Sequence, residues 1–191
     1  MLKRGFKAQC ERRTIEVRKQ LELTERDPLK ALTLAKHLNV DVKSALEIPG
    51  VSDQDIKQLV NVDPEGWSAF TIKIKEQHLI VFNPSQSPGR LNSVIMHELS
   101  HITLGHELAG GHTTEQGLFF ANHYNQDQEH EADWLGSALL LPRPALMHIR
   151  KSNWSNNAAC DYYQTSLDML VYRFRVTGVD AQLHNSQKKK I

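Results

Sequence analysis

The chain has 191 residues, a formal net charge of +1 and 40% hydrophobic residues, which is the composition of an ordinary globular protein. This length gives room for one domain with its own core, and the near-neutral charge favours no polyanionic partner. The longest apolar runs, "LIVF" and "ALLL", are far shorter than the roughly 18 residues that a membrane span needs, so we expect no contact with a membrane.

The N-terminal segment predicts a cytoplasmic protein that begins with a helix. Its start, "MLKRGFKAQCERR", is basic but leads into charged, helix-like sequence instead of an apolar segment, so we expect no secretion signal. Cys10 and Cys160 form no C-x-x-C pair, which suits a reducing compartment. Apolar residues at helical spacing predict a helix over residues 6–22. Its basic residues favour a solvated face, and we expect no direct contact with nucleic acid.

The next segment predicts a second helix and has the outline of a DNA-binding motif. In "DPLKALTLAKHLNV", Asp27 can cap and Pro28 can open a leucine-rich helix. The longer run "LTLAKHLNVDVKSALEI" resembles a helix-turn-helix, whose recognition helix presents polar side chains to base edges. Residues 42–48 offer only Lys43 and Ser44 for that purpose, so DNA recognition is disfavoured.

Residues 68–125 change from a strand pattern to a helical one. "SAFTIKIKEQHLIVFN" alternates apolar and polar residues before a more apolar run, which predicts a hairpin over Ser68–Asn83. "NPSQSPGR" is a loop before the helix that contains Val94–Glu107. "LAGGHTTEQGLFFANHYN", which includes Gly110–Asn125, has no clear period and is interpreted as a surface loop that overhangs a site.

The C-terminal third predicts a series of helices. "QDQEHEADWLGSALLLP" ends against Pro142, and Pro144 opens a short helix. "TSLDMLVYRFRVTG" predicts a last helix, capped by Thr165 or Ser166 and stopped by Gly178. We therefore expect one domain, 1–191, with N-terminal helices (1–60), a hairpin and site helices (66–142), C-terminal helices (143–180) and a flexible tail (181–191).

The stretch "VIMHELSHITLGHE" has the pattern of a metal site. Residues four apart on a helix share a face, so His97 and His101 can direct ring nitrogens at one ion, about 2.0 to 2.1 Å away. Glu98, between them, can reach a water at the ion without being a ligand itself. This is the H-E-x-x-H arrangement of zinc metallopeptidases, which requires a third ligand.

The sequence just after this motif does not supply that ligand. The longer metzincin signature needs a glycine and a third histidine at offsets that here hold Leu104 and Glu107. His106 is one residue short of the required offset. Because it lies near the helix end, we favour a role for it as a partner of a ligand or as a helix cap over direct ligation.

The segment "EHEAD" offers carboxylates for the third position. Glu129 can complete a site of two histidines and one carboxylate, and Asp133, one turn along, can accept a hydrogen bond from a ligand histidine. Glu131 is the competing carboxylate. It points roughly opposite to Glu129 on a helix and lacks an acidic residue four positions on, so Glu129 is preferred.

Two long segments carry a family resemblance. "NPSQSPGRLNSVIMHELSHITLGH" and "EHEADWLGSALLLPRPAL" resemble the ImmA/IrrE family of zinc metallo-endopeptidases. The N-terminal helices and "SLDMLVYRFRVTG" are also similar to that family, so the resemblance covers most of the chain. Gly136 and Ser137 stand where the family often has alanines, a difference that we expect to affect packing more than chemistry.

The resemblance implies a fold and a set of roles. We expect a zincin-like α+β domain, mostly helical, with a small antiparallel β-sheet and the site between that sheet and two helices. Zinc is the implied cofactor, with His97, His101 and Glu129 as its ligands. Glu98 is the implied general base, and Asp133 orients a ligand.

The donor that stabilises the developing oxyanion is left open by the sequence. An extended peptide is expected to add to the edge of the hairpin, with Arg90 and the Gly110–Asn125 loop beside it. Histidine, tyrosine and arginine side chains near the motifs are all candidates for the donor: His106, His112, His123, Tyr124, Tyr162, Tyr163, Tyr172 and Arg173.

The resemblance also implies a purpose. Members of the family are regulatory proteases that cleave or antagonise helix-turn-helix repressors in bacteria and their mobile elements. The leading interpretation is therefore a cytoplasmic zinc endopeptidase with a narrow protein substrate, such as a repressor. The alternative is a catalytically silent binding module that keeps the zinc fold and acts as an anti-repressor or transcriptional regulator. An intact Glu98 favours the enzyme.

Overall fold

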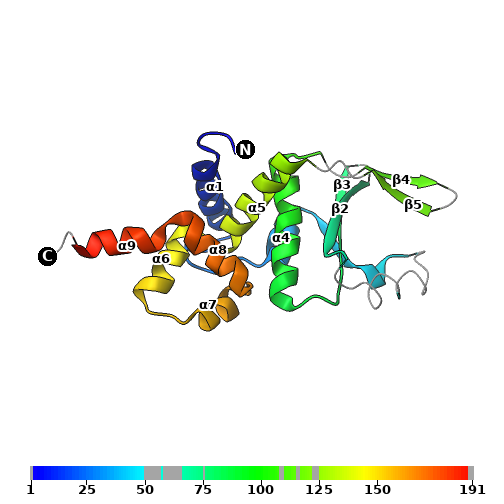
Figure 1. Cartoon of the computed structure of the whole chain (residues 1–191). Helices are drawn as coiled ribbons and strands as arrows, with labels where there is room; N and C mark the ends of the chain where they lie inside the picture. Colours follow the sequence, from blue (N-terminus) through cyan, green and yellow to red (C-terminus); the bar gives the residue numbers. More distant parts are fainter. Residues whose placement is uncertain are drawn as a thin grey trace.

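The computed structural model describes residues 2–49, 57, 66–74, 76–107, 110–114, 117–121 and 125–188, and of these the side chains of 74, 110–114, 117–121, 187 and 188 are not described (Figure 1). Within these ranges the fold is mostly helical, as expected from the sequence. The helices are α1 (Phe6–Gln20), α2 (Ala31–His37), α4 (Pro88–Leu104), α5 (Gln126–Leu140), α6 (Arg143–Lys151), α7 (Asn156–Tyr163), α8 (Leu167–Thr177) and α9 (Val179–Lys188). The strands are β1 (Asp41–Ser44), β2 (Ala69–Ile74), β3 (Gln77–Phe82), β4 (Gly110–Thr114) and β5 (Gly117–Ala121).

Helix α4 runs through the centre of the molecule, between the sheet and most of the other helices (Figure 1). Its side chains Met96 and Leu99 are fully buried, and Leu135 and Leu139 of α5 are buried in the same core. Burying apolar area of this kind is the main stabilising term of the fold. Because α4 and α5 are fixed by this core, the polar residues on their shared side have a rigid support.

The three-stranded sheet has the order β1-β3-β2. β2 and β3 form the expected antiparallel hairpin, with Thr71 opposite Ile80. β1 pairs parallel to β3, with Val42 opposite Ile80, so the sheet is mixed and not purely antiparallel. This order leaves β2 at an edge of the sheet.

The helix-turn-helix outline is not realised. After α2 the chain forms β1 and a short 3-10 helix (Ala45–Glu47) capped by Ser44, so there is no recognition helix over residues 42–48. The alternation in "NVDVKS" is a strand signal, with Val40 buried between exposed neighbours. Asp27 does not cap α2 either: its carboxylate accepts a hydrogen bond from the Thr24 N–H, and α2 begins after Lys30.

Two other predictions were wrong. The segment interpreted as a surface loop contains the antiparallel hairpin of β4 and β5, in which Gly110 pairs with Ala121. The expected last helix is also not the last one, because α9 continues after α8 into the segment expected to be a flexible tail. Gly178 ends α8 with a φ of 63°, and Val179 is then fully buried, which anchors α9 to the core. The predicted cap Ser166 and stop Gly178 of α8 are confirmed.

No helix in the part of the chain that the structure describes is both long and apolar enough to span a membrane.

Candidate metal centre

Helix α4 brings two imidazoles to one place. Ser87 caps the helix by accepting a hydrogen bond from the Arg90 N–H, Pro88 opens it, and Gly105 ends it with a φ of 69°. His97 and His101 are one turn apart on the inner face, and their Nε2 atoms are 3.0 Å from each other. This is the juxtaposition expected from their four-residue spacing.

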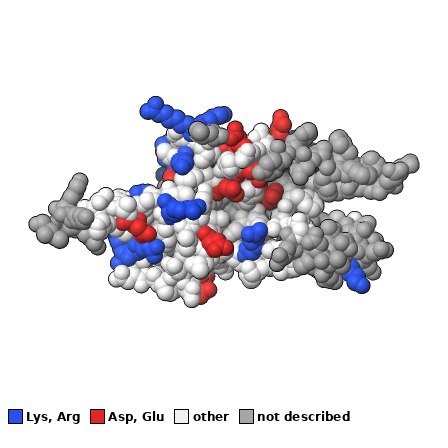
Figure 2. Space-filling view, viewed as in Figure 1, with Lys and Arg blue, Asp and Glu red and all other residues white. Residues whose placement is uncertain are grey.

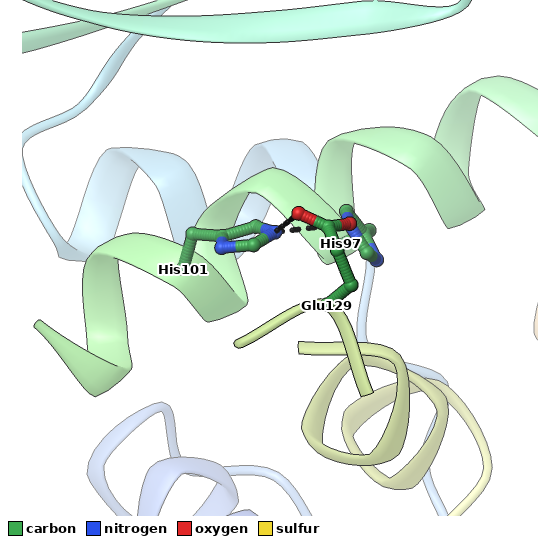
Figure 3. Close-up of side chains that lie close together, drawn as sticks. All are labelled: His97, His101 and Glu129. Atoms are coloured by element: carbon green, nitrogen blue, oxygen red, sulfur yellow. Dashed lines mark hydrogen bonds and ion pairs between the residues drawn. The ribbon is translucent and has the colours of Figure 1, made fainter. Parts of the chain in front are cut away.

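Helix α5 contributes the third group. Asn125 caps α5 by accepting hydrogen bonds from the first backbone N–H groups, which places Glu129 in the first turn. The Glu129 carboxylate lies between the two rings, with Oε2 3.2 Å from His97 Nε2 and Oε1 3.5 Å from His101 Nε2 (Figure 3). One ligand atom from each of the three residues lies within 4.8 Å of the others. Among the described residues they form a cluster able to hold a metal ion.

The donor set and its spacing fit a zinc ion. Tetrahedral zinc with ligands at 2.0–2.1 Å separates neighbouring ligand atoms by about 3.3 Å. The three separations here, 3.0, 3.2 and 3.5 Å, bracket that value. Two imidazoles and one carboxylate also leave the fourth position open, which is typical of catalytic zinc sites.

Asp133 lies where the sequence analysis expected a partner of a ligand. Its Oδ1 is 3.0 Å from His97 Nδ1, so that nitrogen can donate its proton to Asp133 and leave Nε2 facing the cluster. Burial lowers the pKa of His97, but hydrogen bonds with Asp133 and Glu129 outweigh burial and raise it to about 10. Burial and the nearby His97 lower the pKa of His101. Metal binding must therefore compete with a proton on His97.

Glu98 lies beside the cluster and faces the sheet. The Thr71 hydroxyl on β2 donates a hydrogen bond of 2.5 Å to Glu98 Oε2. Burial raises the pKa of Glu98, and the hydrogen bond from Thr71 acts in the opposite direction. A carboxylate whose pKa is raised toward neutrality is a better proton acceptor and donor at physiological pH than an exposed one. Thr71 could not be identified from the sequence, because only the fold brings β2 against α4.

His106 and Glu131 form a second set of contacts around the cluster. His106 Nδ1 lies 2.9 Å from His101 Nδ1, and His106 Nε2 lies 3.2 Å from Glu131 Oε2. Glu131 therefore contacts the site. The expectation that it points away, which came from its position opposite Glu129 on a helix, was wrong. His106 was the sequence signal for this contact, because it follows the end of α4 and its Nε2 can donate a hydrogen bond to Glu131.

The structure separates the candidates for the oxyanion donor. Tyr163 is buried and donates its hydroxyl to the Arg26 carbonyl, and the guanidinium of Arg173 is bound by Leu141 O and Glu11. Tyr162 stacks edge-on against Trp154. These three side chains serve packing. Tyr172 lines a cavity with Asp133, whereas the side chains of His112, His123 and Tyr124 lie outside the described part.

Two adjoining cavities, of about 390 and 270 Å³, open beside the cluster between α4, α5 and α8. Both are lined by Arg90, Ser93, Asp133 and Met169, and the smaller one also reaches His97. Acidic side chains gather over α4 and α5 on this face (Figure 2). A larger cavity of about 480 Å³, between α1, α2, α4 and α5, contains no member of the cluster.

A comparison with protein families agrees with this geometry. The model of the M78 peptidase family, described as the IrrE N-terminal-like domain, matches residues 56–175 of the chain. This range contains α4, α5 and all the residues of the cluster. No curated protein matches the chain.

Proposed function

The chain belongs to the M78 family of IrrE-like metallopeptidases, and from that premise we propose that it is a zinc-dependent endopeptidase, with residues 1–191 forming one zincin-like peptidase domain. The observation that carries the proposal is the convergence of His97, His101 and Glu129 next to a half-buried Glu98. These three residues would hold the ion. Zinc, when bound, polarises the scissile carbonyl and lowers the pKa of water toward about 7.

The chain's own residues then move the proton. Glu98 accepts it from the attacking water and passes it to the leaving amine, which requires the carboxylate to be ionised first and protonated afterwards. Thr71 holds one carboxylate oxygen by donating to Glu98 Oε2, which leaves Oε1 to meet the water. Asp133 keeps His97 oriented through Nδ1.

The position of β2 supports binding of an extended peptide. β2 is an edge strand, and its Thr71 contacts the general base directly. A peptide that adds to this edge by main-chain hydrogen bonds would lie along Glu98. Arg90, which contacts Ser68 just before β2, would border it, and the cavities beside His97 would take its side chains.

We propose a helix-turn-helix repressor as the substrate, because the resemblance of the two motif segments to ImmA/IrrE peptidases implies it. A cytoplasmic location is consistent with the free thiols of Cys10 and Cys160. The alternative function is a silent binding module that captures the same repressor without cutting it.

The test compares wild type with Glu98→Gln on purified helix-turn-helix repressors in the presence of zinc. We expect wild type to cut one repressor at a defined bond, and Glu98→Gln to bind that repressor and cut it at least about 10²-fold more slowly. Cleavage is followed by mass spectrometry of the fragments. Undiminished cleavage by the variant contradicts the role of Glu98, and binding without cleavage by both proteins supports the binding module.

A further inference from the structure

Both candidate ligand histidines have a partner on the ring nitrogen that faces away from the cluster. His97 Nδ1 meets the carboxylate of Asp133 directly, at 3.0 Å. His101 Nδ1 instead meets a second imidazole, His106, at 2.9 Å, and that ring meets Glu131 at 3.2 Å. The two ligands are thus held by two different arrangements.

The backbone places His106 for this contact. Gly105 adopts a positive φ of 69° and turns the chain at the end of α4, and the His106 N–H then donates to the His101 carbonyl at 3.0 Å. The two rings meet edge to face, with centroids 5.0 Å apart. The His106 side chain is only 6% exposed and that of Glu131 20%, whereas the Asp133 carboxylate is 60% exposed. The arrangement around His101 is therefore the better shielded of the two.

The proton positions follow from the carboxylate at the outer end. Glu131, when ionised, can only accept, so His106 donates from Nε2 and has a lone pair at Nδ1. His101 must then donate from its own Nδ1 to that lone pair. The consequence is that His101 Nε2 carries a lone pair and points at the cluster, as a metal ligand requires. With the opposite tautomer of His106, the lone pair at its Nε2 would face the Glu131 carboxylate at 3.2 Å, and the proton of His101 would lie on Nε2, towards the cluster.

We propose that Glu131 and His106 are positioning residues that fix the tautomer of His101 and so raise the affinity of the site for zinc. This inference rests on the proposed function, because it needs the cluster to bind the ion. His106 acts through His101, and Glu131 acts through His106. His106 is not a ligand in this arrangement, because one of its nitrogens contacts His101 and the other contacts Glu131. Glu131 is not one of the three residues of the cluster.

The competing explanation is a purely structural one, in which His106 and Glu131 only tie the end of α4 to α5. The two explanations predict different measurements. A structural tie changes the stability of the metal-free protein and leaves the intrinsic affinity for zinc unchanged, whereas positioning changes the affinity itself.

The experiment measures the dissociation constant for zinc of the full-length chain by competition with a chromogenic chelator. We expect His106→Ala to bind zinc about 10- to 100-fold more weakly, which is the effect that partners of metal ligands usually have. His106→Asn keeps an acceptor oxygen near the position of Nδ1 and should recover most of the loss. Glu107→Gln, which removes an exposed carboxylate one residue away, is the control for charge and should leave the affinity unchanged.

A double-mutant cycle tests the order of the contacts. Glu131→Gln should weaken zinc binding in the wild type, and should have no further effect when His106 is already alanine. Equal effects in both backgrounds would overturn the proposal. So would unchanged affinity in Glu131→Gln, which also decides the case if His106→Ala does not fold.

The thermal melting of each metal-free variant accompanies these measurements. If a variant of His106 or Glu131 melts at a lower temperature but binds zinc as tightly as wild type, the two residues only stabilise the packing of α4 on α5, and the positioning role is refuted. Failure of the wild type to bind zinc refutes the proposed function and the inference together, whereas a wild type that binds zinc as tightly as its variants refutes the inference alone.

Discussion

At the scale of single residues, the chemistry depends on how the protein holds Glu98. Its side chain is half-buried against the sheet, and this burial raises its pKa. Thr71 opposes that effect by donating a hydrogen bond that favours the ionised form. The balance between the two sets the pH at which the carboxylate becomes able to accept a proton.

Replacing Thr71 by valine should move the activity of the peptidase to higher pH. Valine keeps the shape of the side chain but removes the donor, so the pKa of Glu98 rises further and the carboxylate is protonated up to a higher pH. The acidic limb of kcat/KM, measured against pH with the cleaved repressor, should shift upward, while zinc content stays at the wild-type level.

Thr71→Ser is the matched control, because it restores the hydroxyl and should return the acidic limb to its original position. An acidic limb that is the same in all three proteins would mean that the contact between Thr71 and Glu98 has no part in the proton transfer.

At the scale of elements, the geometry of the site depends on the close approach of α4 and α5. Gly136 of α5 lies against α4 at the level of the first ligand. A Cβ at this position would be 3.2 Å from Ser100 Oγ and 3.4 Å from the backbone of His97. The glycine thus lets the helix that carries Glu129 pack directly on the helix that carries the histidines.

Gly136→Val should separate the two helices and weaken the metal site. Overpacking of a close contact costs about 1–3 kcal/mol of unfolding free energy, and the displacement of α5 moves Glu129 relative to His97 and His101. Urea unfolding of the metal-free protein measures the first effect, and the zinc dissociation constant measures the second.

Gly5→Val provides a comparison for Gly136→Val, because Gly5 lies outside this interface and nothing within 4 Å surrounds its Cβ position. Its positive φ of 86° makes valine strained there, so some stability is lost, but zinc affinity should be unchanged. Wild-type affinity in Gly136→Val would show that the spacing of the two helices does not control the site.

Local sequence patterns predicted the parts of the molecule that depend on local geometry. The four-residue spacing of His97 and His101 needs only a helix to bring the two rings together, and the caps at Ser166 and Gly178 need only the helix termini. Glu129, 32 positions from His97 along the chain, was selected by its helical facing and by the family resemblance, and the structure places it between the two rings.

The features that the sequence analysis missed depend on contacts between distant segments. Thr71 reaches Glu98 only because the sheet packs on α4, and a strand pattern does not say which helix lies against it. Glu131 seemed misdirected on a helical wheel, because that argument considers one partner helix and omits His106, which comes from the turn after α4. β1 was missed because four residues beside an apparent helix-turn-helix carry little signal of their own.

At the scale of the whole molecule, every proposal depends on one zinc ion held by α4 and α5 together. The central claim is that Glu129, from the second of these helices, completes the site begun by the H-E-x-x-H motif. Its carboxylate is ionised in this setting, because the hydrogen bond with His97 lowers its pKa. Such a group can bind a metal without first losing a proton.

The most direct measurement is the zinc content per chain of wild type and Glu129→Ala, by elemental analysis after dialysis against buffer without strong chelator, with folding checked by circular dichroism. About one zinc per wild-type chain and a clear loss in the folded variant are the expected result for a site of three ligands. A folded wild type without metal, or a variant that keeps a full complement of zinc, would contradict the assignment.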